Sequence, residues 1–305
     1  MSGKNVTEVR LADAAGIGEA ARILESGGLV AVPTETVYGL AARADSAEAV
    51  AKIYAAKGRP DFNPLIVHVR GVEQAELYAE LSPEARALAE THWPGPLTLV
   101  LPRRADAGLA AAVTAGLPTV AVRVPAHPAM RALLERCDFP LAAPSANRSG
   151  FISPTTPAHV LASLDGRIDM VLDGGATSAG VESTIVAVRA DGSVEELRPG
   201  PLQIGARAEG GGIEAPGQLA SHYAPGKPVR LNAVAAEADE FLIGFGSVAG
   251  DCTLSASGDL TEAAANLYAC LHQAARAEQP RIAVAPVPEE GVGRAINDRL
   301  RRAAA

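Results

Sequence analysis

Short apolar segments alternate with helix-like segments along the first 200 residues, and this order restricts the folds open to the chain. Runs rich in Val, Leu and Ile, such as those at 97–101 and 119–124, are typical of buried strands. Aromatic residues make up only 4% of the sequence, so aliphatic side chains must build the core. The alternation predicts an α/β or α+β fold, in which helices cover a sheet.

Capping signals mark several of the intervening helices. Asp45 with Glu48 resembles a capping box, and the helix that they open should end at Lys57, with Gly58 as its stop. Ser82-Pro83 has the pattern of an N-cap followed by proline at the first helical position. We predict further helices near 12–26, 127–136 and 157–164, and further strands at 28–33, 64–70, 140–143, 169–172, 183–189 and 194–198.

A change in composition at residues 199–228 predicts a domain boundary. This stretch is rich in Gly and Pro, which favour turns and linkers. We predict a first domain at 1–205, a linker at 206–227 and a second, smaller α/β domain at 228–305. The linker contains Ser221-His222-Tyr223-Ala224-Pro225, which is not generic linker chemistry. In the second domain we predict strands at 228–232, 241–245 and 281–285 and helices near 260–277 and 289–302.

Charge and cysteine content exclude several classes of protein. The net charge of −8 disfavours stable general binding to nucleic acid, which depends on Lys and Arg. Cys137, Cys252 and Cys270 are far apart and form no C-x-x-C pair, so we predict buried hydrophobic residues and neither a zinc site nor disulfides. No signal peptide and no apolar run of roughly 18–20 residues is evident, so we expect a cytoplasmic protein without membrane contact.

Standard nucleotide and hydrolase motifs are missing. The sequence contains no G-x-x-x-x-G-K-[ST], no H-E-x-x-H and no G-x-S-x-G. Gly244-Phe245-Gly246 with Gly250 is one residue out of register for a dinucleotide fingerprint, and a turn at a strand end is the simpler interpretation.

Two cation-bearing segments indicate an anion site. Lys57 and Arg59 flank Gly58 on a loop that two prolines make rigid, and arginine offers a planar fork to phosphate oxygens. Arg123 lies in the apolar strand at 119–124, on the same face as Ala121 and Thr119. The alternative is an edge strand with Arg123 in water. His68 also lies in an apolar strand, where an isolated histidine is more often a hydrogen-bonded core residue than a catalyst.

Three hydroxyl-bearing segments follow or open predicted strands. They are Pro33-Thr34-Glu35-Thr36-Val37-Tyr38, Pro144-Ser145-Ala146-Asn147-Arg148-Ser149-Gly150 with Ser153, and Glu182-Ser183-Thr184. Each alone could be ordinary turn chemistry. Together with the two cationic segments, and without an obvious nucleophile–base pair, they predict a site that orients anions and not a hydrolase.

Six segments, taken in order, resemble the YrdC-type threonylcarbamoyl-AMP synthase family. They are PTETVYGL, KGRPDFNPLIVH, TVAVRVP, PSANRSG, ESTIV and LRPG, within about residues 15–205. The tail with SHYAP resembles the long, two-domain form of that family. Residues 214–220 lack the basic side chains that family members often carry before this motif.

The resemblance implies a fold and a reaction. The fold would be a twisted mixed sheet with helices around a deep, positively lined cavity, followed by a Rossmann-like C-terminal domain. The reaction would join L-threonine, bicarbonate and ATP, with Mg²⁺, into threonylcarbamoyl-AMP and pyrophosphate. A downstream transferase would use this product to form threonylcarbamoyladenosine in tRNA.

The resemblance also implies roles for residues. Lys57 and Arg59 would carry catalysis, and no protein side chain would bind a metal. Threonine would meet Thr36, His68, Arg123, Ala143 and Ser183. ATP would meet Lys57, Arg59, Asn63, Thr119, Ser145, Ser153, Arg198 and Tyr223.

Two alternatives remain open from the sequence. One is an RNA-binding module without catalysis, for which Lys52, Lys57, Arg59 and Arg70 would supply cations. The other is a carbamoyl-transferring maturation enzyme, although the chain lacks acylphosphatase-like and zinc-finger segments.

Overall fold

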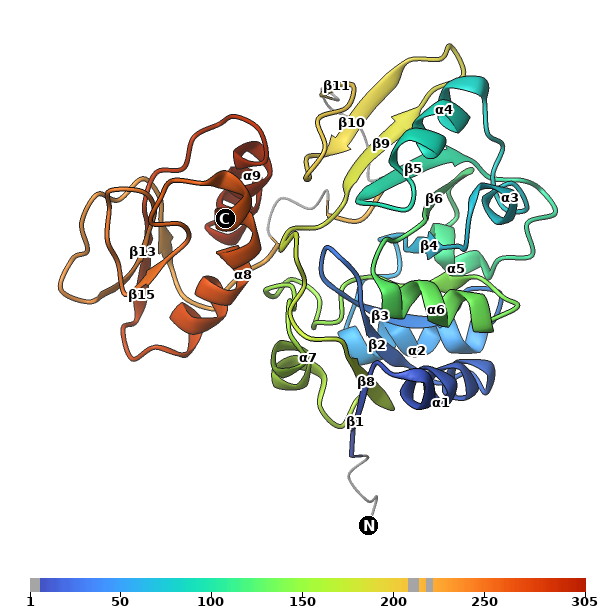
Figure 1. The fold of residues 1–305 in the computed structure, drawn as a ribbon, viewed down its shortest axis with the longest axis horizontal. Coiled ribbons are helices and arrows are strands. Elements are labelled where there is room, and N and C mark those ends of the chain that lie inside the picture. Colours follow the sequence, from blue (N-terminus) through green and yellow to red (C-terminus); the bar gives the residue numbers. More distant parts are fainter. Residues whose placement is uncertain (1–5, 208–213, 218–221) are drawn as a thin grey trace.

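The computed structural model describes residues 6–207, 214–217 and 222–305. Within these residues the strands form two separate sheets, one of eleven strands and one of four (Figure 1). The large sheet has the order β1-β8-β2-β3-β7-β4-β6-β5-β9-β10-β11 and mixes parallel with antiparallel pairs. Its strands are β1 (Glu8–Leu11), β2 (Val30–Pro33), β3 (Tyr38–Arg43), β4 (Ile66–His68), β5 (Leu97–Pro102), β6 (Thr119–Arg123), β7 (Leu141–Ala142), β8 (Met170–Asp173), β9 (Thr184–Val188), β10 (Val194–Arg198) and β11 (Ala206–Arg207).

Helices cover both faces of the large sheet. On one face α1 and α6 pack together over the first strands, where Leu24 and Leu133 join one apolar cluster. On the other face Ile53 of α2, Ala89 of α4 and Val160 of α7 join the largest cluster. The helices of this part are α1 (Ala14–Glu25), α2 (Ala47–Lys57), α3 (Val72–Ala75), α4 (Pro83–His92), α5 (Ala111–Thr114), α6 (Pro128–Arg136) and α7 (Pro157–Leu164).

Local capping chemistry explains where α2 and α4 begin and end. Gly58 closes α2 in the left-handed conformation at φ 59°, which glycine adopts without strain, as expected. Ser82 caps α4 by accepting from the backbone N–H of Ala85, as expected. The expected capping box at Asp45 is wrong. Ser46 is the N-cap of α2, because its side chain accepts from the backbone N–H of Ala49, and Asp45 is paired with Arg43.

The C-terminal unit is a parallel sheet with two helices. Strands β12 (Val229–Arg230), β13 (Glu240–Gly244), β14 (Cys252–Thr253) and β15 (Arg281–Val284) follow the order β12-β15-β13-β14. Helices α8 (Leu260–Arg276) and α9 (Gly293–Ala303) lie between this sheet and the rest of the molecule (Figure 1).

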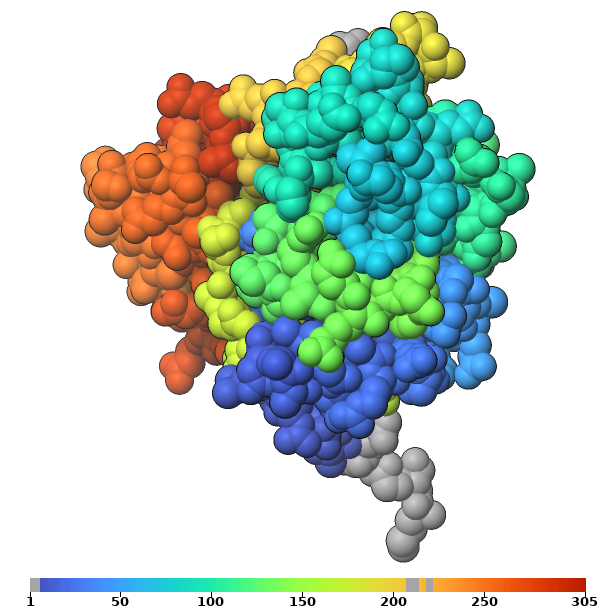
Figure 2. Space-filling model, turned by 45° about the vertical axis from the view of Figure 1, so that its right-hand side comes forward, coloured from blue at the N-terminus to red at the C-terminus, as the bar shows by residue number. Residues whose placement is uncertain are grey.

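The two units share one apolar cluster. Leu267 and Ile243 of the C-terminal unit belong to the same buried cluster as Val37, Ile152 and Val181 from the first part of the chain. Figure 2 shows the orange and red C-terminal unit in contact with the yellow segment that precedes it. The large sheet and the small sheet therefore form a continuous body.

Further sequence expectations need correction or addition. Cys252 and Cys270 form a disulfide, so the expectation of none is wrong for this pair. Their separation of 18 residues concealed that β14 packs beside α8. Cys137 is buried and free, as expected. Strand β3 was missed because the polar turn before it resembled a loop, and α9 begins at Gly293, later than expected.

Within the described ranges, no helix combines the length and apolar character that a bilayer span requires.

Candidate functional site

A cavity opens where strands of the large sheet meet the linker. Strands β4 and β6 run parallel and both end at this point, which is where open α/β sheets place their ligand sites. The wall includes Thr34, Thr36, Gly39, Arg59, Ile66, His68, Arg123, Ala143, Ser145, Glu182, Ser183, Arg198, Pro216, Gly217, His222 and Tyr223.

Sheet register explains why polar groups from distant segments face the cavity together. His68 is the direct partner of Arg123, and Arg123 is the direct partner of Thr98. Direct partners on neighbouring strands point to the same face of a sheet. Thr98 then contacts the Ser183 hydroxyl at 2.8 Å. A row of polar side chains thus crosses three strands and reaches Ser183, which directly precedes β9. Strand β6 is an interior strand, not the edge strand of the alternative.

The turn between β2 and β3 presents a chain of hydroxyl groups. The Thr34 hydroxyl donates to the carbonyl of Val37 at 2.6 Å, so it accepts from the Thr36 hydroxyl at 2.8 Å. Arg123 Nη1 in turn donates to the Thr36 hydroxyl at 3.0 Å. These bonds fix the orientation of each hydroxyl beside the guanidinium.

Arg123 and Glu35 form a buried ion pair beside these hydroxyls. Only 4% of the Arg123 side chain and 14% of the Glu35 side chain is exposed. Burial tends to raise the pKa of Glu35, but the charge of Arg123 and hydrogen bonds, including one from Ala126 N–H at 2.9 Å, lower the pKa below its usual value. Glu35 is therefore ionised, and it holds the guanidinium at the cavity wall.

His68 is neutral at this wall. Its burial, followed by the nearby charge of Arg123, lowers the pKa of the imidazole to about 3. Its Nδ1 lies 3.3 Å from the carbonyl oxygen of Ile66. A neutral imidazole can donate or accept a hydrogen bond, but at neutral pH it adds no charge to the site.

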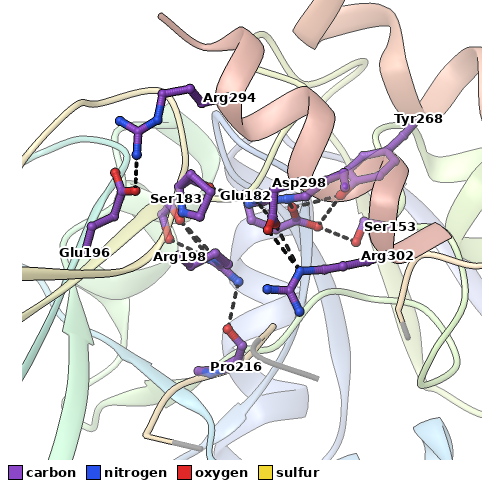
Figure 3. A network of polar contacts seen from close by, with 12 residues as sticks. Ser153, Glu182, Ser183, Glu196, Arg198, Pro216, Tyr268, Arg294, Asp298 and Arg302 are labelled. Carbon is purple, nitrogen blue, oxygen red and sulfur yellow. Dashed lines mark hydrogen bonds and ion pairs between the residues drawn. The ribbon is translucent and has the colours of Figure 1, made fainter. Parts of the chain in front are cut away.

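Arg198, at the end of β10, contacts Ser183, which directly precedes β9. Arg198 Nη2 donates to the Ser183 hydroxyl at 3.1 Å and to the Ser183 carbonyl at 2.9 Å. Arg198 Nη1 donates to the carbonyl of Pro216 in the linker at 3.3 Å (Figure 3). Burial lowers the pKa of Arg198. The guanidinium therefore ties the linker to the strand that carries Ser183.

Arg59 and Lys57 lie on different sides of the cavity wall. Arg59 lines the cavity, and its guanidinium donates to the carbonyls of Asn63 at 3.0 Å and Pro64 at 2.7 Å. Lys57 is 3% exposed and lies behind the wall, where its ammonium donates to the carbonyls of Ser145 and Asn147. Burial, and then the charge of Arg59, lowers the pKa of Lys57 well below its usual value.

The linker closes one side of the cavity. Tyr223 is 1% exposed and adopts φ 64°, a conformation that a non-glycine residue rarely holds without support. The next residue, Ala224, donates its N–H to the carbonyl of Gly150 at 2.8 Å. His222 N–H donates to the carbonyl of Arg302 at 3.1 Å, and burial lowers the pKa of its imidazole to about 3. Residue Ser221 of the same motif lies outside the described residues.

The sequence-predicted site residues divide into two groups. Thr36, Arg59, His68, Arg123, Ala143, Ser145, Ser183, Arg198 and Tyr223 share this cavity. The other four, which are Lys57, Asn63, Thr119 and Ser153, are not part of its wall. Asn63 is nevertheless close to Arg59, and both polar atoms of its buried side-chain amide lack a partner in the described part of the chain.

Sequence reasoning missed several residues of the site. Glu35 and Glu182 lie in segments that the sequence analysis singled out, but no role was predicted for either residue. In the linker motif a role was predicted for Tyr223 and not for its neighbour His222. Tyr268 and Arg299 reach the site from α8 and α9, and no local pattern in the sequence marks them.

Family models match both parts of the chain. The Sua5_yciO_yrdC model, described as "Telomere recombination", matches residues 22–200. The Sua5_C model, described as "Threonylcarbamoyl-AMP synthase, C-terminal domain", matches residues 192–305.

Similar proteins extend over nearly the whole chain. A threonylcarbamoyl-AMP synthase of Bacillus subtilis is 40% identical over 322 aligned residues, which cover 94% of this chain and 92% of that protein. The enzyme of the same name from Pyrococcus abyssi is also 40% identical, and covers 93% of this chain and 92% of that protein. The crystal structure of P. abyssi Sua5 complexed with L-threonine has a TM-score of 0.87 and 37% identity, over 98% of this chain and 97% of that one.

Proposed function

The chain belongs to the Sua5/YrdC family of threonylcarbamoyl-AMP synthases, and we propose from this that its cavity joins L-threonine, bicarbonate and ATP into threonylcarbamoyl-AMP. The observation that carries the proposal is the meeting of Arg59, Arg123 and Ser183 at one cavity. These residues come from three distant segments. Family membership also favours a synthase over an RNA-binding module.

Arg123 provides the clamp for the carboxylate of threonine. Its Nη1 and Nη2 each carry two N–H groups, and each uses one on Thr36 or Glu35. Both nitrogens therefore keep capacity for a second acceptor, in the fork geometry that suits a carboxylate. The neutral His68 and the hydroxyls of Thr36 and Ser183 would surround the amino acid, and would disfavour analogues that lack the side-chain hydroxyl.

Arg59 provides the main cation for the triphosphate. The Asn63 and Pro64 carbonyls hold its guanidinium in place at the wall. The buried side-chain amide of Asn63 has a donor and an acceptor without partners among the described residues, but it is not part of the cavity wall. Lys57 supports the same region indirectly, because its ammonium holds the Ser145–Asn147 loop.

The reaction needs no nucleophile from the protein. The neutral amine of threonine adds to bicarbonate, with loss of water, and forms an N-carboxylate. This carboxylate attacks the α-phosphorus of ATP, and pyrophosphate leaves. The protein aligns the two substrates and stabilises charge on the phosphate oxygens, which is the role of preorganised donors.

Magnesium fits this site as an ion that arrives with ATP. Mg²⁺ commonly keeps several waters and binds through substrate phosphates and one or two carboxylates. The two carboxylates near the cavity are already engaged, Glu35 by Arg123 and Glu182 by Arg299. When bound, the ion would neutralise part of the charge on the triphosphate.

We further propose that the product passes to a tRNA-modifying transferase in the cytoplasm. Threonylcarbamoyl-AMP is a mixed anhydride, which hydrolyses if it is not used. An acceptor enzyme must therefore consume it to form threonylcarbamoyladenosine.

Pyrophosphate release from ATP, measured with and without threonine and bicarbonate, tests the proposal. We expect release only when both are present, and Arg59→Ala should slow it by about 2–4 kcal/mol in the transition state, or roughly 30- to 1000-fold. Arg103→Ala is the matched control, because Arg103 is exposed and remote from the cavity. Pyrophosphate release that does not depend on threonine, or an Arg59→Ala variant with normal turnover, would contradict the proposal.

A further inference from the structure

A buried network joins the C-terminal unit to the cavity wall at Glu182. The Glu182 carboxylate accepts hydrogen bonds from the Ser153 hydroxyl at 2.5 Å and from Arg299 Nε at 3.0 Å. The Tyr268 hydroxyl lies 2.8 Å and 2.9 Å from its two oxygens (Figure 3). Tyr268 belongs to α8 and Arg299 to α9, and both side chains are fully buried. Two helices of the C-terminal unit thus hold a carboxylate that lines the cavity.

Arg299 also holds a second segment of the wall. Its Nη1 donates to the carbonyl of Pro199 at 2.7 Å. Glu182 directly precedes Ser183, and Pro199 directly follows Arg198. The guanidinium of Arg299 therefore binds both segments of the wall, the one that carries Ser183 and the one that carries Arg198.

The two gripped segments are in close contact with each other. A Cβ atom added to Gly200 would lie 2.2 Å from the backbone nitrogen of Thr184. Displacement of either segment must therefore move the other, because no space separates them.

The network keeps charge balanced inside the protein. Burial tends to raise the pKa of Glu182, but the charges of Arg299 and then Arg198 outweigh it and lower the pKa to about 2. Asp298 accepts from Arg299 Nη1 at 3.0 Å and also pairs with Arg302 at 3.1 Å. The C-terminal unit thus supplies Arg299, the cation that keeps Glu182 ionised. Its Asp298 also fixes the orientation of the Arg299 guanidinium.

We propose that Tyr268 and Arg299 are positioning residues of the adenylate-forming site. They fix Glu182 and Pro199, and through them the Ser183 and Arg198 wall, so the C-terminal unit supports the cavity from outside its wall. This inference rests on the proposed function, because it concerns the same reaction.

Conservative variants test the inference on the full-length chain. Arg299→Lys keeps the charge but cannot reach both Glu182 and Pro199, and Tyr268→Phe removes only a hydroxyl. We expect each to lower kcat/KM for threonine at least about 10-fold, since small displacements of aligned groups are costly. Arg301→Lys is the matched control on α9. It is 48% exposed, pairs with Glu289 at the surface, and should stay within about twofold of wild type.

A pH profile separates positioning from simple loss of stability. Arg299→Met removes the cation, so the pKa of Glu182 should rise, and activity should fall as the carboxyl gains a proton at acidic pH. Wild type, in which Glu182 stays ionised, should lack this ionisation between about pH 5 and 8. The further change Glu182→Gln should remove the new acid limb, because glutamine does not titrate.

The outcomes distinguish the inference from the proposed function. If wild type releases no pyrophosphate in response to threonine, the proposed function fails. If wild type is active and Arg299→Lys and Tyr268→Phe match the Arg301→Lys control, the inference alone is refuted. Circular dichroism establishes that each variant is folded, and Tyr268→Phe decides the question if the Arg299 variants do not fold.

Discussion

Removal of Arg123 should damage the protein in two separable ways. The Arg123→Met variant loses the clamp proposed for threonine, and it leaves Glu35 buried without its cation. Breaking a buried ion pair from one side costs about 3–5 kcal/mol of stability. Loss of a hydrogen bond to a charged ligand group costs about 1.5–3 kcal/mol, or roughly 10- to 150-fold in the Kd for threonine.

A second substitution separates the two effects. Arg123→Met with Glu35→Gln removes both charges, so it should recover most of the lost stability, because no uncompensated carboxylate remains. It should not recover affinity for threonine. Glu35→Gln alone is the matched control for the loss of the carboxylate.

Two measurements on the same samples decide the matter. Urea denaturation gives the free energy of unfolding of each variant, and calorimetric titration gives its Kd for threonine. A double variant that binds threonine as wild type does would refute the carboxylate clamp. A double variant no more stable than Arg123→Met would refute the argument from the buried pair.

Three further predictions follow from the structure. Gly217→Ala should weaken ATP binding about 10-fold, because its Cβ would lie 2.9 Å from Arg198 Cδ and 3.1 Å from the Tyr223 hydroxyl, and unchanged binding would contradict this. Gly226→Ala is the matched control, since Gly226 also has a positive φ but open space around it. The contribution of His68 to the free energy of unfolding should be fully present above about pH 6.5. It should be lost as the pH falls toward 3, because His68 gains a proton in the unfolded chain but stays neutral while it is buried in the folded protein. That contribution is about 1.4 kcal/mol per pH unit, and urea unfolding of His68→Gln should show a shallower decline than wild type. Cys252→Ser should lower the free energy of unfolding by about 3 kcal/mol, because the disulfide closes a loop of 18 residues. Under oxidising conditions, a melting temperature equal to that of wild type would refute this.

Much of the sheet and part of the site could be predicted because local patterns record them. The period of two in 119–123 placed Arg123 and Ala121 on one face, and Ala121 now lies in a small apolar cluster on that face. Ser82-Pro83 and Gly58 marked helix ends through backbone chemistry that acts within a few residues.

The missed features depend on contacts between distant residues. Arg299 is fully buried because Asp298 and Glu182, which lies 117 positions earlier, balance its charge, and a helix that ends in several arginines looks solvent-exposed in sequence. The placement of Lys57 likewise depends on a distant segment, because carbonyls of the Ser145–Asn147 loop hold its ammonium behind the wall. The Cys252–Cys270 pair likewise depends on β14 lying beside α8.

The apolar cluster shared by the two sheets couples their thermal unfolding. Val37, which lines the cavity, and Val181 belong to the same buried cluster as Leu267 of α8. A chain cut at the linker would expose these valines to water, so the amino-terminal fragment would lose stability and tend to self-associate. Heating the intact protein should therefore give one cooperative calorimetric transition, not a separate peak for each sheet.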